Sequence, residues 1–74
     1  MAKVEIESEV SGNVWKIEMS VGDSVQVDDA IMILESMKME IPVEATEAGV
    51  IAEILVQEND QVDEDQVVVI LEKS

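Results

Sequence analysis

The side chains of this chain that could do chemistry are mainly carboxylates and amines. The sequence contains no cysteine and no histidine, which excludes cysteine nucleophiles, imidazole bases, disulfides and typical zinc sites. Four basic residues stand against 18 acidic ones. Among these few basic residues, only Lys38 lies between two methionines, Met37 and Met39. A free lysine amine is mostly protonated at neutral pH, so it becomes a nucleophile only when another enzyme removes its proton.

Lys38 also lies at the centre of an internal repeat. The 74 residues divide after Met37 into two halves, 1–37 and 38–74, which align without a gap. Clear matched pairs are Gly12 with Gly49, Ile17 with Ile54, Asp23 with Asp60 and Val25 with Val62. We therefore expect one domain, 1–74, built from two copies of one unit that join at Met37-Lys38.

The abundance of β-branched residues predicts an all-β fold. Val and Ile together number 21 and Leu only 3, and β-branched side chains pack well in strands. The predicted strands are 3–7, 12–19, 24–25 and 30–36 in the first half, and 39–44, 49–56, 61–62 and 67–73 in the second. The continuous apolar runs 31–34 and 67–71 indicate central strands. Pro42 cannot donate to a ladder, so its strand is predicted at an edge or with its nitrogen facing away from the neighbouring strand.

The segments between the predicted strands carry matched residues that tolerate a left-handed backbone. Gly22 matches Asn59, and Asp28 matches Asp65. Gly, Asn and Asp adopt positive φ at the lowest cost. We predict that at least two of these four residues, one from each half, have positive φ.

The charge and hydropathy of the chain exclude several classes of partner. A formal charge of −14 disfavours nucleic acid and anionic membrane surfaces, since both would repel the protein. The apolar runs are too short to span a bilayer, and the N-terminus has no apolar stretch of signal-peptide length, so we expect a cytoplasmic location. The acidic segments 58–60 and 63–65 lack the calcium-loop pattern, and we predict no metal site.

The residues around Lys38 resemble a known family. The segment Glu35-Ser36-Met37-Lys38-Met39-Glu40 is similar to the attachment sequence of the biotin/lipoyl attachment family, and most closely to that of free-standing biotin carboxyl carrier-like proteins. Segments 12–16, 22–25, 49–53 and 59–62 follow the same family pattern. The resemblance therefore covers essentially the whole chain, and a Met-Lys-Met motif at a repeat junction is more specific than the motif alone.

This resemblance implies both a fold and a function. The implied fold is a flattened barrel or sandwich of two four-stranded antiparallel sheets with a pseudo-twofold axis, without the protruding thumb of some bacterial carriers. The implied function is that of a carrier with no catalytic residues, in which biotin protein ligase attaches biotin to Lys38. The modified protein would then carry carboxybiotin between a biotin carboxylase and a carboxyltransferase.

The residues beside Lys38 would be ligase-recognition elements in this family. Flexible side chains such as Met37 and Met39 can fill an apolar ligase pocket, although we expect at least one of them to pack inward. Glu35, Ser36 and Glu40 are lesser candidates, since acidic residues this common usually form a solvated face.

The sequence departs from the family at two places. Asp28 and Asp65 stand where related carriers have glycine, and residues 9–11, Glu-Val-Ser, replace a segment near the lysine that commonly contains proline. The second departure changes the face that the protein would present to a carboxylase.

Three alternatives remain open. Lipoyl carriers share the fold and often have Glu-Ser or Glu-Thr before the attachment turn, as Glu35-Ser36 does here, whereas Met37 and Met39 do not fit their pattern. The second alternative is a site modified by both biotin and lipoyl ligases. The third, from another class, is an unmodified acidic interaction module.

Overall fold

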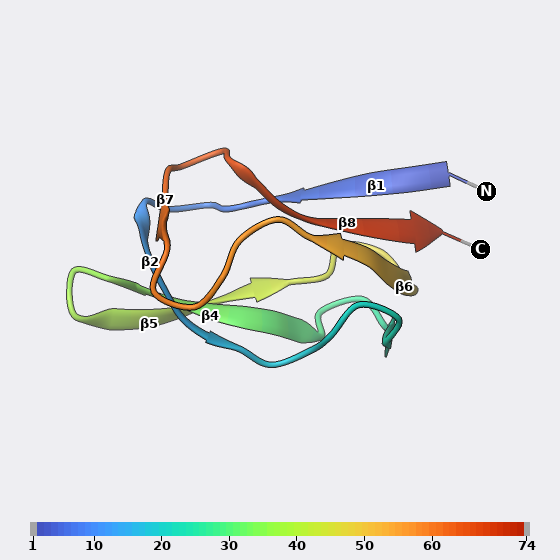
Figure 1. Cartoon of the computed structure of the whole chain (residues 1–74), viewed down its shortest axis with the longest axis horizontal. Helices are drawn as coiled ribbons and strands as arrows, with labels where there is room; N and C mark the ends of the chain where they lie inside the picture. The colour runs from blue at the N-terminus through green and yellow to red at the C-terminus, as the bar shows by residue number, and fades with distance from the viewer. Residues whose placement is uncertain (1, 74) are drawn as a thin grey trace.

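The computed structural model describes residues 2–73, which form eight strands in two sheets (Figure 1). The strands are β1 (Ala2–Glu7), β2 (Gly12–Ile17), β3 (Ser24–Val25), β4 (Ala30–Ser36), β5 (Met39–Glu44), β6 (Gly49–Ile54), β7 (Gln61–Val62) and β8 (Val67–Lys73). One sheet has the order β1-β8-β6-β3 and the other the order β5-β4-β2-β7, and all pairs are antiparallel. The predicted architecture of two four-stranded antiparallel sheets is confirmed.

The two halves of the chain build the same structure. Adding 37 to the bounds of β1 to β4 reproduces the bounds of β5 to β8 without exception, for example 2 + 37 = 39 and 7 + 37 = 44. The same shift converts the order of one sheet into that of the other. Even the irregularities match, because the β2–β4 register shifts between Val14 and Lys16 and the β6–β8 register between Ile51 and Glu53. Within residues 2–73 the connections of the two halves are therefore equally long, and no thumb-like insertion protrudes.

The central strands supply the core, as their continuous apolar runs predict. β4 and β8 are each hydrogen-bonded on both sides. Their buried side chains, which have no more than trace exposure, are Ile31, Met32 and Leu34 in β4 and Val68, Val69 and Leu71 in β8. Pro42 lies in β5, which is an edge strand as predicted.

The predicted strands 12–19 and 49–56 end two residues early, at Ile17 and Ile54. The next amide on each strand still bonds to a central strand, Glu18 N–H to the Ile31 oxygen and Leu55 N–H to the Val68 oxygen, both at 2.9 Å. The chain then leaves the ladder, while Val56 remains buried on the core. The apolar pattern continued past the strand end because a side chain can pack on the core without strand pairing.

The turns adopt the left-handed conformations predicted from their residue types. All four positions have positive φ: Gly22 at 97°, Asp28 at 73°, Asn59 at 77° and Asp65 at 69°. Neighbouring acidic residues close the turns at Gly22 and Asn59, since Asp23 Oδ2 accepts from Ser20 N–H and its repeat mate Asp60 Oδ2 accepts from Gln57 N–H, both at 2.9 Å. Part of the negative charge therefore has a structural role in the turns.

The molecule is elongated, with extents of 36 × 19 × 18 Å. Ala2 pairs with Lys73 at one end, and the β4–β5 hairpin forms the other end (Figure 1). No helix long and apolar enough to cross a membrane occurs in residues 2–73.

Candidate functional site

A two-residue loop at the far end of the molecule carries Lys38. β4 ends at Ser36, β5 begins at Met39, and these two residues pair directly across the hairpin. The loop residues Met37 and Lys38 have φ values of 52° and 66°. Two consecutive residues with positive φ in a two-residue hairpin loop define a type I′ turn, whose twist matches that of the flanking strands.

This turn is strained, because neither loop residue is one that prefers the left-handed region. An L-residue other than Gly, Asn or Asp in that conformation costs on the order of 1 kcal/mol or more. The strands below the turn hold it in place through six registered pairs, one of which joins Ile41 to the fully buried Leu34. Strained backbone of this kind is concentrated at functional sites.

Sequence reasoning did not anticipate positive φ at Met37 and Lys38, because the turn contains no Gly, Asn or Asp. The predicted strand bounds nevertheless indicate the type of this turn. Strands 30–36 and 39–44 leave two residues between them, and two-residue hairpin loops are mostly of type I′ or II′.

Both methionines project into solvent, so the expectation that at least one packs inward is wrong. Met37 is 92% exposed and Met39 is 62% exposed. Met39 faces the same side of β5 as Ile41, which lies opposite Leu34 in the last layer of the core. Because the hairpin continues past that layer, the inward direction at Met39 leads beyond the end of the core into water.

The structure brings all the predicted recognition residues together at this tip. Ser36 pairs with Met39, and Glu35 pairs with Glu40. Leu34 and Ile41 face the core, so the alternation along both strands turns Glu35 and Glu40 to the outer face. Directly opposed like charges repel each other, which keeps this face solvated.

Lys38 has no carboxylate partner among residues 2–73, where the one ion pair joins Lys73 to Glu47 at 2.6 Å. The hydrogen bond that the Lys73 ammonium donates to Glu47, together with the negative charge of Glu47, raises the pKa of Lys73. The repeat places Ser36 where Lys73 stands and Val10 where Glu47 stands, so the hairpin end lacks both members of that pair. The Lys38 amine is exposed and free of a structural role in the described part of the chain.

A glycine of β2 lies against β4 immediately before the turn. A Cβ atom at Gly12 in β2 would lie 2.5 Å from the backbone oxygen of Glu35, closer than any real Cβ contact. Its repeat mate Gly49 has the same relation to Glu72, at 2.6 Å. The sequence match of these two glycines does not by itself indicate a role. The structure shows that Gly12 allows β2 to approach the last two residues of β4, just before the turn.

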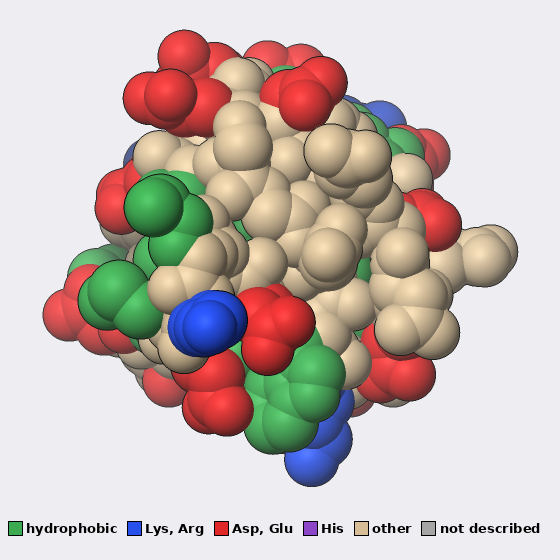
Figure 2. Space-filling model, turned by 90° about the vertical axis from the view of Figure 1, so that its left-hand side faces the viewer, with side chains coloured by type: hydrophobic (Ala, Val, Ile, Leu, Met, Phe, Trp, Pro, Cys, Tyr) green, Lys and Arg blue, Asp and Glu red, His purple; other side chains and the backbone are tan. Residues whose placement is uncertain are grey.

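The end of the molecule that carries the hairpin has a mixed surface. Figure 2 looks at this end and shows hydrophobic side chains beside a basic one, with acidic groups around them. Residues 2–73 contain no group of three acidic side chains placed to hold a metal ion. The arrangement can therefore present an amine on a raised turn to another enzyme, between two flexible apolar side chains.

Known proteins are similar to this chain in sequence and in fold. Residues 5–71 match the biotin/lipoyl family model described as "Biotin-requiring enzyme". The chain is 39% identical over 66 residues to the biotin/lipoyl attachment protein of Bacillus subtilis, covering 89% of this chain and 90% of that one. It is 40% identical over 57 residues to the biotin carboxyl carrier protein of acetyl-CoA carboxylase from Haemophilus influenzae, covering 77% of this chain and 37% of the relative.

The same fold occurs inside a much larger solved protein. The crystal structure of Kluyveromyces lactis urea carboxylase superposes with a TM-score of 0.91 at 34% identity, over 96% of this chain and 6% of that one. The family match spans nearly the whole chain, and the structural match reproduces both sheets. This chain belongs to the biotin/lipoyl attachment family.

Proposed function

We propose that this protein is a biotin carrier and that a biotin protein ligase acylates Lys38. The observation that carries the proposal is the strained two-residue turn, which holds an exposed, unpaired lysine between two exposed methionines. The deprotonated Nζ of Lys38 attacks the carbonyl carbon of biotinyl-adenylate, an amide bond forms, and AMP leaves. When bound, biotin supplies a ring nitrogen that can carry a carboxyl group.

The chain contributes presentation and reach to this function. The type I′ turn directs the Lys38 stem away from the core, and the paired strands β4 and β5 fix the position of its base. The described chain ends lie at the opposite end of a 36 Å molecule, so a partner can approach the lysine without obstruction from them. The similarity to a urea carboxylase and to a biotin carboxyl carrier supports a biotin carboxylase and a carboxyltransferase as the partners served.

Lipoate is the second candidate for the group attached to Lys38. The Bacillus subtilis relative is named for both biotin and lipoyl attachment, and Glu35-Ser36 fits the lipoyl pattern. Intact-mass measurement of the protein from its native host, with peptide mapping to Lys38, separates a biotinyl adduct, a lipoyl adduct and the unmodified interaction module.

The variant Lys38→Arg tests the proposed site, because arginine keeps the charge but has no amine that forms this amide. After incubation with biotin protein ligase, ATP and biotin, we expect no mass increase in the variant. Lys16→Arg is the matched control, since Lys16 is an exposed strand lysine, and it should be labelled like the wild-type protein. Labelling of the Lys38→Arg protein at Lys3, Lys16 or Lys73 would refute the proposal.

A further inference from the structure

The outer face of the sheet that carries the hairpin has an exposed aromatic side chain. Trp15 is the one aromatic residue of the sequence, and it is 50% exposed. It lies in the register shift between Val14 and Lys16, where β2 has one more residue than β4. Val14 is buried on the core side, whereas Trp15 and Lys16 are both exposed. The bulge therefore turns two consecutive side chains to the outer face.

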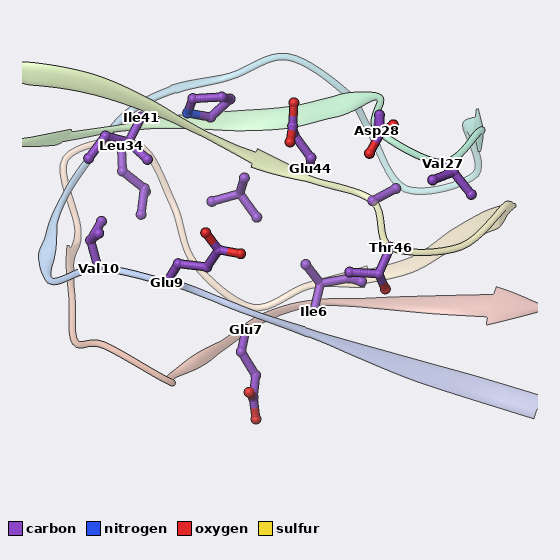
Figure 3. Close-up of a pocket in the computed structure, with 13 residues that line it drawn as sticks. Ile6, Glu7, Glu9, Val10, Val27, Asp28, Leu34, Ile41, Glu44 and Thr46 are labelled. Carbon is purple, nitrogen blue, oxygen red and sulfur yellow. The ribbon is translucent and has the colours of Figure 1, made fainter.

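Two apolar side chains of neighbouring strands extend this surface. Ile33 pairs with Lys16 in β2 and with Pro42 in β5, so Ile33 and Pro42 lie in one line across the sheet beside Trp15. Ile33 is partly exposed and Pro42 is exposed. Leu34, the next residue of β4, takes the opposite side and lines a groove formed by residues of both sheets (Figure 3). Trp15, Ile33 and Pro42 therefore form an apolar row on the outer face, the Trp15 row.

The repeat shows that folding does not require the Trp15 row. The matched bulge in β6 carries Ala52, and the matched edge position in β1 carries Glu5 in place of Pro42. The two bulges have the same register shift, so the same backbone accepts a methyl group where β2 has an indole. The part of an indole that stays in water brings the folded state no gain. The apolar row is thus particular to the sheet whose hairpin carries Lys38, which indicates a binding role.

The Trp15 row lies within reach of a group attached to Lys38. Trp15 stands opposite Ile33 and Leu34, about four residue steps from the turn, or roughly 13 Å at about 3.3 Å per residue. About eleven bonds join the Cα of a biotinylated lysine to the bicyclic ring, an extended reach of roughly 14 Å at about 1.25 Å per bond. The indole projects from β2 and covers the remaining sideways distance of about one strand spacing, roughly 4.8 Å.

A tethered ring needs only weak contacts to occupy this surface. A ligand on a short flexible tether has an effective concentration in the millimolar range, so contacts with a dissociation constant of about 1 mM occupy the surface about half of the time. The ring system of biotin has apolar faces and a thioether sulfur, and both kinds of group contact indole favourably. The amide that joins biotin to lysine is uncharged, so the acidic surface of the protein does not repel the arm.

We propose that the biotinyl group on Lys38 docks on the Trp15 row of its own domain. The ring lies against the indole and over Ile33, and docking withdraws it from water between encounters with partner enzymes. This inference rests on the proposed biotinylation of Lys38. The two are tested separately, because intact mass reports the acylation and the environment of Trp15 reports the docking.

The fluorescence of Trp15 tests the docking directly, since the sequence has one tryptophan. The protein is biotinylated with ligase, ATP and biotin, and intact mass checks that acylation is complete. We expect the acrylamide quenching constant to be roughly twofold lower than in the unmodified protein, because a ring docked about half of the time shields the indole for that share of the time. An unchanged constant in the fully acylated protein would overturn the docking and leave the carrier function intact, whereas absence of acylation would overturn both.

The repeat supplies the matched control. The double variant Trp15→Ala with Ala52→Trp moves the tryptophan to the equivalent bulge of the opposite sheet, away from the sheet that carries Lys38. Its quenching constant should not change on biotinylation, and circular dichroism checks that the variant folds. An equal reduction there would mean that acylation alters the protein generally, which would refute docking on the Trp15 row.

A concentration series of the wild-type protein separates docking within one molecule from association between two. Docking in the same domain predicts that the lower quenching constant of the biotinylated protein is independent of protein concentration. A reduction that appears only as the concentration rises would show that the ring binds a second molecule, and would overturn the proposal.

Discussion

At Lys38 the backbone is more unusual than the side chain. The lysine and the preceding methionine both adopt positive φ, and neither residue type prefers it. The turn persists because the two strands that it joins are anchored on the core through Leu34. The backbone at this position is strained, and the strained turn places the lysine amine at the outermost point of the molecule.

Replacing the first loop residue with one that tolerates the left-handed region should stabilise the protein. Met37→Asn places asparagine at the position where type I′ turns prefer it, and we expect a gain of up to about 1 kcal/mol in the free energy of unfolding. Urea denaturation measures the change. Met39→Asn is the control, because Met39 lies in β5 and outside the positive-φ residues, and it should bring no gain. Equal effects of the two substitutions would contradict the assigned strain.

The methionines should discriminate biotin from lipoyl ligases. The double substitution Met37→Asp with Met39→Ala converts the turn to the Glu-Ser-Asp-Lys-Ala pattern of lipoyl carriers. We expect the rate of biotinylation to fall sharply and lipoylation to be kept or gained, as measured by intact mass against time with each purified ligase.

The fold should survive this double substitution, because both methionine side chains lie in solvent, and circular dichroism checks it. If the folded variant is biotinylated as fast as the wild-type protein, the shape and position of the turn carry recognition and the methionines do not.

Among the strands, the close approach of β2 to β4 helps to fix the position of the β4–β5 hairpin. Gly12 and Gly49 occupy matched positions where a side chain would collide with a carbonyl oxygen of the neighbouring central strand. Backbone atoms cannot move aside as the end of a flexible side chain can. The repeat therefore retains glycine at these two positions for space, and at Gly22 for its positive φ.

A substitution pair separates these two requirements. Gly12→Ala should lower the free energy of unfolding by about 1–3 kcal/mol and shift the amide resonances of Glu35 and Ser36, because the new Cβ pushes β4 away. The Cβ atom that Gly22→Ala adds would have no other atom within 4 Å. It should cost only the left-handed strain of about 1 kcal/mol and leave the hairpin resonances in place. Unchanged hairpin resonances in Gly12→Ala would show that this contact does not position the site.

For the molecule as a whole, repulsion between like charges is an electrostatic term opposed to the compact state. A net charge of −14 is spread over a body only 18–19 Å across its two short axes. At about 0.01 M salt the Debye length is roughly 30 Å, which exceeds the two short dimensions of the molecule, whereas at about 1 M it is roughly 3 Å. Folding concentrates this charge, and screening should relieve the repulsion.

We therefore expect Tm to rise by several degrees between low-salt buffer and about 0.5 M NaCl. Differential scanning calorimetry measures the shift. The variant Glu53→Gln with Glu72→Gln carries less charge and should show a smaller rise. A Tm that falls with salt would mean that attractive pairs such as Lys73–Glu47 outweigh the repulsion.

Local chemistry in the sequence determined most of the architecture of this protein. The gap-free repeat, the β-branched runs and the turn residues Gly22, Asp28, Asn59 and Asp65 each constrain a few neighbouring residues, and five of the eight strand bounds follow from them without error. The position of Lys38 at the repeat junction also follows from sequence, since a join between two like units has to be a connection between strands.

Tertiary structure alone decided the features that depend on where the core stops and which strands lie at an edge. Met39 alternates as an inward-facing residue but is exposed, because the hairpin extends beyond the last core layer. Val56 continues an apolar strand pattern but packs from outside the ladder. A groove lined by residues of both β1 and β5 exists because these two strands, far apart in the chain, are both outer strands of their sheets. Sequence periodicity reports which side of a strand a residue takes, whereas exposure depends on what the rest of the chain places opposite that side.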